Sequence, residues 1–103
     1  MPVQEWKIRM ADGDDLFTAE NIAATEKVLQ SYTDSLSQLQ EPSEEELIGK
    51  VKEVVLRLNE VNEAYDFFIE TLEREELCNF IMEKAQRAGL DTDEDITEEW
   101  REW

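Results

Sequence analysis

The chain of 103 residues contains no histidine, one cysteine, three glycines and two prolines. Because histidine is the commonest general base, its absence removes serine–histidine and cysteine–histidine catalytic pairs. A single cysteine excludes an intramolecular disulfide. The scarcity of glycine and proline disfavours a turn-rich β fold. These absences favour a helical protein without the usual nucleophile–base pairs.

Long hydrophobic runs are also missing from the sequence. No stretch approaches the roughly 20 apolar residues that cross a bilayer. The first residues lack the basic stretch and apolar run of a secretory signal. We therefore expect a cytoplasmic protein that does not enter a membrane.

Acidic residues outnumber basic ones, 27 against 10, which gives a formal net charge of −17. Such a charge repels phosphate backbones and anionic membrane surfaces, so we expect no direct nucleic-acid or membrane binding. It attracts a basic protein partner. The alternative reading is that the charge only keeps a small protein in solution.

One long segment carries an uninterrupted helical pattern. Apolar residues recur at alternating spacings of four and three: Leu47, Val51, Val54, Leu58, Val61, Tyr65, Phe68 and Leu72. This spacing keeps one face of an α-helix apolar. Ser43 and Glu46 form the pattern of a capping box, which marks a helix start. The sequence therefore predicts a helix over residues 43–70.

Two further helices are predicted beside it. A similar stripe, with Thr18 as N-cap, predicts a helix over residues 18–39. Residues 71–89 form the third, with Thr71 as its N-cap and Gly89 as the left-handed residue that ends it. The alternative is that this helix and the helix over residues 43–70 merge into one bent helix. The short links between the segments predict antiparallel packing.

Residues 1–17 fit two patterns. Trp6, Ile8 and Met10 alternate with charged residues, as in a half-buried strand. Val3, Trp6 and Met10 equally share one face of a helix. No second alternating run exists to pair with a strand, so we expect an extended arm laid on the helices.

The C-terminal residues 90–103 form an acidic segment that ends in a short helical turn with Trp100 and Trp103. The whole chain, residues 1–103, is therefore predicted as one all-α domain. Its expected architecture is an antiparallel three-helix bundle with an N-terminal extended arm and a short C-terminal helical turn.

Three residues near the main stripe have two readings each. Asn62 interrupts a neighbouring apolar stripe and is expected at the exposed boundary, although a polar residue there can also fix register. Phe67 lies outside the main stripe, so it either contacts the third helix or is exposed. Cys78 shares a helix face with Ile81 and is expected to be a small buried hydrophobe rather than a reactive thiol.

Two strings of acids match metal-binding motifs in spacing. The paired Glu-x-x-Glu and Glu-x-x-Asp motifs of magnesium-dependent helical pyrophosphohydrolases are matched by Glu41, Glu44, Glu63 and Asp66. Glu44 and Glu63, which belong to different halves of this motif, would lie about 28 Å apart along the predicted helix, and this distance argues against a shared metal site. Positions 1, 3, 5 and 12 of a calcium-binding loop are matched by Asp91, Asp93, Asp95 and Glu102, but Ile96 replaces the required glycine. We expect no metal, no cofactor and no enzymatic activity.

The remaining candidate is a protein-binding surface. Tryptophan is enriched at interface hot spots, and chain ends are often free until docked. The predicted partner-binding residues combine tryptophans near the two ends with neighbouring acids: Trp6, Glu73, Glu76, Asp91, Asp93, Asp95, Glu99, Trp100 and Trp103. The alternative is that the rings fold back and add to the core.

The sequence therefore predicts a small acidic non-enzymatic protein-binding module for a basic partner. An inhibitor, an immunity protein or an antitoxin would fit this description. The alternatives are an oligomeric helical scaffold or chaperone-like protein, with a homodimer as one form, and a DNA mimic that places carboxylates where phosphates lie on a duplex.

Overall fold

The computed structural model describes residues 1–103 as a set of helices joined by short links. The elements are α1 (Pro2–Ala11), α2 (Ala19–Ser37), α3 (Glu44–Ala64), α4 (Thr71–Arg87) and the short 3₁₀ helix η1 (Ile96–Glu99). No strand is present, so the predicted all-α class is confirmed. The molecule is compact but somewhat elongated, with extents of 43 × 23 × 22 Å.

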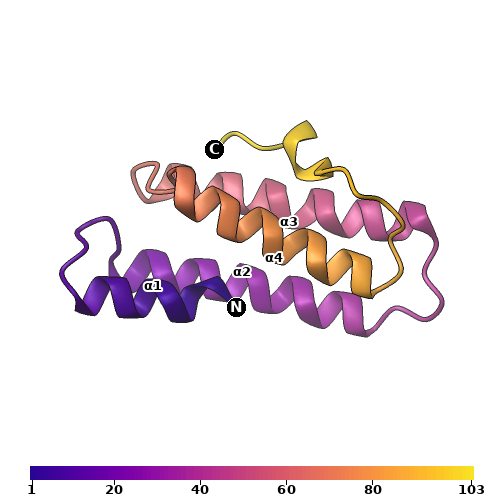
Figure 1. The fold of residues 1–103 in the computed structure, drawn as a ribbon, viewed down its shortest axis with the longest axis horizontal. Helices are drawn as coiled ribbons and strands as arrows, with labels where there is room; N and C mark the ends of the chain where they lie inside the picture. Colours follow the sequence, from indigo (N-terminus) through magenta and orange to yellow (C-terminus); the bar gives the residue numbers. More distant parts are fainter.

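Helix α4 holds the other elements together. Figure 1 shows α2 and α3 as a long antiparallel pair, with α4 lying along both of them. Helix α4 contacts α1, α2, α3 and η1, whereas α1 packs only on α2 and α4. The α1–α2 and α3–α4 links meet at one end of the molecule, and the α2–α3 link lies at the other (Figure 1).

Local sequence signals set three helix boundaries as predicted. The Thr18 hydroxyl accepts a hydrogen bond from the Asn21 amide at 3.0 Å, and the Asn21 side chain accepts one from the Thr18 amide at 3.0 Å. Ser43 and Glu46 exchange the same pair of bonds, each at 3.1 Å. Gly89 has a φ of +121°, which suits the residue after a helix end.

The predicted extended arm at the N-terminus is wrong, because Pro2–Ala11 forms a helix. Proline is well placed in a first helical turn, where its missing N–H has no partner to lose. Val3 and Trp6 are both fully buried, while Ile8 is 57% exposed. The helical face therefore describes these residues, and the architecture is four-helical rather than a three-helix bundle with an arm.

The predicted helix over residues 43–70 ends early, at Ala64. The Phe67 amide donates to the Asn62 carbonyl at 2.7 Å, and the Ile69 amide donates to the Asn62 side-chain oxygen at 2.9 Å. These bonds replace the helical ladder and turn the chain. Asn62 is only 3% exposed, so the expectation that it lies at the exposed boundary is wrong.

The α3–α4 link separates the last two residues of the predicted stripe. Phe68 is still buried, but it reaches the core from the link rather than from a helix. Leu72 belongs to the first turn of α4 and is 52% exposed. Glu70, rather than the predicted Thr71, is the N-cap residue of α4. The apolar spacing thus continues across the break between α3 and α4, so the spacing alone does not predict where α3 ends.

The core contains the apolar faces of all four helices, and apolar residues of the C-terminal segment pack against it. Its largest fully buried side chains are Trp6, Leu29, Leu47, Leu58, Leu77 and Ile81. The Tyr32 hydroxyl donates to the Ile81 carbonyl at 2.7 Å and so joins α2 to α4. Burial raises the pKa of Tyr32. None of the helices combines the length and the apolar character that a membrane-spanning segment requires.

Candidate partner-binding surface

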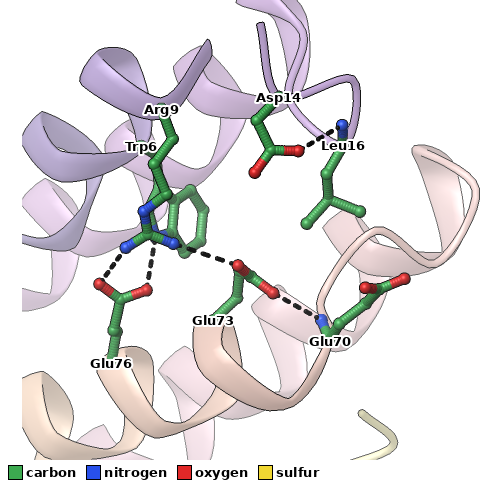
Figure 2. A network of polar contacts seen from close by, with 7 residues as sticks. All are labelled: Trp6, Arg9, Asp14, Leu16, Glu70, Glu73 and Glu76. Carbon is green, nitrogen blue, oxygen red and sulfur yellow. Dashed lines mark hydrogen bonds and ion pairs between the residues drawn. The ribbon is translucent and has the colours of Figure 1, made fainter. Parts of the chain in front are cut away.

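Three of the predicted partner-binding residues lie in a network between α1 and α4 (Figure 2). Arg9 donates one hydrogen bond to Glu73 at 3.2 Å and another to Glu76. The Trp6 indole nitrogen donates to the Glu76 carboxylate at 3.2 Å. The other oxygen of Glu73 accepts from the Glu70 amide at 3.2 Å, at the start of α4. Two carboxylates are thus shared by one guanidinium, one indole and one helix terminus.

Aromatic rings close the inner side of this network. The Trp6 ring stacks on Phe17 with centroids 5.2 Å apart and meets Phe68 edge-on at 6.0 Å. The Arg9 guanidinium lies 5.7 Å from the centre of the Phe17 ring. The hydrogen bond to Glu76 raises the pKa of Arg9 further above its already high value. Arg9 is therefore a permanent cation that fixes α1 on α4.

In this network the three predicted partner-binding residues, Trp6, Glu73 and Glu76, form hydrogen bonds within the chain. Trp6 is fully buried and Glu73 is 4% exposed, so neither can reach a partner in this structure. Glu76 is half-buried and already binds Trp6 and Arg9. The physical reason is that Trp6 and Arg9 share a face of α1 that docks on α4, which places a cation beside these two carboxylates.

The C-terminal acids remain at the surface. Asp91, Asp93, Asp95 and Glu99 are all exposed. Asp95 also has a structural role, because its carboxylate accepts hydrogen bonds from the amide of Thr97, at 3.0 Å, and from the Thr97 hydroxyl. Its second oxygen lies 3.5 Å from Arg101. Asp91, Asp93 and Glu99 form no ion pair.

The C-terminal tryptophans are half-buried and pack against the core. Asn59 of α3 holds this segment through its backbone. The Asn59 side chain donates to the Trp100 carbonyl at 2.9 Å and accepts from the Glu102 amide at 3.1 Å. Arg101 donates to the Trp103 carbonyl at 3.1 Å and lies over the Trp103 ring. Trp100 and Trp103 therefore add to the core, as the alternative reading of the sequence predicts, while each residue keeps part of its surface exposed.

The residues of the two metal-motif strings are not gathered into a ligand set. No group of three or more His, Cys, Asp or Glu side chains is placed to hold a metal ion. Cys78 is partly buried, and its sulfur lies 3.3 Å from the Thr97 hydroxyl. Burial raises the pKa of the Cys78 thiol, which disfavours the reactive thiolate.

The most exposed large apolar residue is Phe67, at 65%. It lies in the α3–α4 link, where both Asp66 and Phe67 have a positive φ, of 62° and 56°. The flanking Phe68 and Ile69 are buried, at 4% and 6%. Phe67 was not among the predicted partner-binding residues, although exposure was one of its two readings from the sequence. Its only signal was its position beside the main stripe, one residue before Phe68.

Phe67 borders a groove between the two links at that end of the molecule. We call it the end groove and define it by six of its lining residues: Asp15, Leu16, Tyr65, Asp66, Phe67 and Glu70. In Figure 2 the Glu70 carboxylate points away from the Arg9 network. Asp15, Asp66 and Glu70 are exposed and take part in no ion pair, and no basic residue lines the groove.

Few of the acids are neutralised by a nearby base. Only six of the 27 carboxylates form an ion pair: those of Glu26, Glu53, Glu73, Glu76, Glu83 and Asp95. The remaining carboxylates leave a strongly negative surface whose field extends into solvent by about a Debye length, roughly 8–10 Å at physiological salt.

Comparisons of the chain with protein-family models, with curated proteins and with solved structures found no match.

Proposed function

We propose that this chain is a small non-enzymatic binding module that docks a basic protein through its acidic surface. The observation that carries the proposal is that only six of 27 carboxylates have an ion-pair partner within the chain. Unpaired surface charges of one sign accelerate encounter with an oppositely charged protein and oppose association with nucleic acid.

A binding role of this kind suits an inhibitor, an immunity protein or an antitoxin. Such a protein needs a rigid surface that is complementary to its target, and it needs no chemistry of its own. The four packed helices supply the rigid frame. The acids supply long-range attraction, which raises the association rate more than it strengthens the final contact.

The proposal is tested by affinity capture with the full chain as bait at low and at high salt. The captured protein is identified by mass spectrometry, purified, and titrated against the chain by calorimetry. We expect a basic protein whose affinity weakens as salt rises. A partner that is acidic, or one whose affinity does not change with salt, would contradict the proposal.

A charge-reduced variant makes this test specific. Asp91→Asn, Asp93→Asn and Glu99→Gln together remove three exposed, unpaired charges and leave the fold contacts in place. We expect a slower association rate and a weaker salt dependence, with an unchanged circular dichroism spectrum. As the matched control, the triple variant Glu26→Gln, Glu53→Gln and Glu83→Gln also removes three charges, but from carboxylates that Lys7, Lys50 and Arg87 already pair, so its effect on association should be smaller.

Self-association is a second candidate, because three large apolar side chains are more than half exposed. These are Phe67, Ile8 and Leu72, at 65%, 57% and 52%. A homodimer would cover such residues but would bring together two chains of charge −17. Sedimentation velocity over a range of concentrations decides the matter. A monomer at all concentrations and at high salt would exclude the oligomeric scaffold.

A further inference from the structure

We propose that the end groove is the docking site for the basic partner, and that its occupant is an arginine-rich segment carrying an apolar side chain. Phe67 is the anchor of this site, and Asp15, Asp66 and Glu70 are its charged rim. This inference rests on the proposed function and gives it a location, a partner chemistry and a test of its own.

The fold presents Phe67 outward in a fixed position. Its φ of 56° follows the φ of 62° at Asp66, and a left-handed conformation is unfavourable for residues other than glycine by roughly 1–2 kcal/mol. The link is nevertheless held on both sides, by the two hydrogen bonds to Asn62 and by burial of Phe68 and Ile69. The ring itself is 65% exposed and adds little to the core. A strained residue whose side chain does not stabilise the fold points to a role outside it.

The negative charge of the end groove favours a basic occupant. Its rim carries three exposed carboxylates with no ion-pair partner, and no lysine or arginine lines it. Its lining also includes the apolar side chains of Leu16, Tyr65 and Phe67. Arginine matches both features, because carboxylates accept its paired N–H groups and aromatic faces attract its charge. An adjacent apolar side chain would cover the exposed ring of Phe67.

The other hollows of the surface do not combine these features. Those along α2 and α3 contain Lys27, Lys50 or Arg57, which would repel a basic segment. The hollow between α4 and the C-terminal segment contains the unpaired acids Asp93 and Glu94, but its apolar lining is the partly buried Cys78 and the buried Met82, so it exposes no large apolar side chain. The end groove is therefore the place where exposed apolar surface and unpaired carboxylates coincide.

The test uses the full chain and two synthetic peptides of equal length and charge, one built of Arg and Leu and the other of Arg and Ser. Affinities are measured by calorimetry at low and moderate salt, and binding is mapped by the amide resonances of the chain. We expect the Arg–Leu peptide to bind more tightly. The largest resonance shifts should lie at Leu16 and residues 65–70.

Phe67→Asn is the decisive variant, because asparagine tolerates a left-handed φ and removes the ring. We expect its affinity for the Arg–Leu peptide to fall about tenfold, with thermal stability unchanged or higher. Ile8→Gln is the matched control, since Ile8 is also more than half exposed but lies outside the groove. That control should bind as the unmodified chain does.

A second pair of variants tests the rim. The triple variant Asp15→Asn, Asp66→Asn and Glu70→Gln should weaken binding of the Arg–Leu peptide several-fold and flatten its salt dependence. The control triple, Glu41→Gln, Glu44→Gln and Glu45→Gln, removes the same charge at the opposite end of the molecule (Figure 1). Equal loss of affinity in both triples would show that charge acts without a defined site and would overturn this inference.

Other outcomes separate the site from the function. If Phe67→Asn binds the Arg–Leu peptide as tightly as the unmodified chain, the site is wrong, while a salt-dependent basic partner would keep the proposed function. If neither peptide binds, the site is equally overturned, and the capture experiment decides the function by itself. If Phe67→Asn instead abolishes concentration-dependent dimerisation, the occupant is a second copy of this chain and the inference fails.

Discussion

The two ends of the chain both carry tryptophan and both pack on α4, yet the structure uses them differently. Trp6 of α1 is fully buried among Phe17 and Phe68 and is hydrogen-bonded to Glu76. Trp100 and Trp103, on the C-terminal segment, are only partly buried. A terminal tryptophan is therefore not by itself a sign of an interface, because its role depends on what its segment can dock against.

The difference follows from how each end satisfies its backbone. Helix α1 makes its own backbone hydrogen bonds, so it docks as a rigid face that the side chains of Trp6 and Arg9 fix on α4. Most of residues 90–103 lacks regular structure, so its polar backbone groups need partners from elsewhere. Asn59 supplies two of them. We therefore expect the C-terminal segment to open locally at a lower free energy than α1.

The largest expected effect is that of Trp6→Ala. Removing a fully buried tryptophan leaves a cavity between α1 and α4, and we expect a loss of about 3–5 kcal/mol in the free energy of unfolding. Trp103→Ala, at a partly buried position, should lose clearly less. Urea unfolding followed by circular dichroism measures both. Equal losses would mean that the two ends of the chain contribute alike to stability.

Arg9→Met should have the next largest effect, about 2 kcal/mol. The change keeps the apolar stem but leaves the Glu73 carboxylate, whose side chain is 5% exposed, without its cation. The partial exposure of Arg9, at 25%, keeps the loss below that of a fully buried pair. Adding Glu73→Gln to this variant should recover part of the stability. A double variant less stable than the single one would refute the view that the buried charge is the cause.

Asn59→Ala should affect the C-terminal segment alone, at a cost of about 1–2 kcal/mol. It removes the donor to the Trp100 carbonyl and the acceptor for the Glu102 amide. Hydrogen exchange should become faster in residues 97–103 and stay unchanged in α1. Asn79→Ala, an exposed position on α4, serves as the control. Faster exchange across the whole molecule would show that the segment is part of the common core.

Tyr32→Phe tests the core that both ends share, and we expect a loss of about 1 kcal/mol at neutral pH. Burial raises the pKa of Tyr32 above its ordinary value of 10.0 in the folded state. The unfolded chain therefore releases this proton first, and the stability that the protonated hydroxyl contributes is lost as pH rises above 10. Urea unfolding at neutral pH and above pH 10 should show a smaller alkaline loss for Tyr32→Phe. An identical loss in both proteins would exclude this contribution.

The boundaries that the sequence predicted well are those set by short-range hydrogen bonds. Thr18, Ser43 and Gly89 act within three or four residues, so their chemistry is visible in the sequence. The end of α3 was missed because Asn62 turns the chain through bonds to residues five and seven positions later, inside an unbroken apolar spacing. At the N-terminus, Trp6 and Met10 fit both a strand and a helix, so pattern alone could not choose.

The candidate surface was harder to predict than the fold. Trp6 and Glu73 were selected for their residue types, but the contact between α1 and α4 buries both. For Phe67 the sequence left two readings, a contact with the third helix or exposure, because the choice depends on a left-handed turn that no single residue type indicates. Asp15, Asp66 and Glu70 join one groove only because two links from distant parts of the chain meet at the same end.

The amino-acid sequence by itself determined the helical class, the main helix starts and the excess of negative charge, since these follow from periodicity, local capping and composition. Tertiary structure alone decided which tryptophan is buried, which carboxylates are neutralised and which aromatic ring faces solvent. The physical reason is that burial and ion pairing depend on contacts between residues as far as 70 positions apart, as between Trp6 and Glu76.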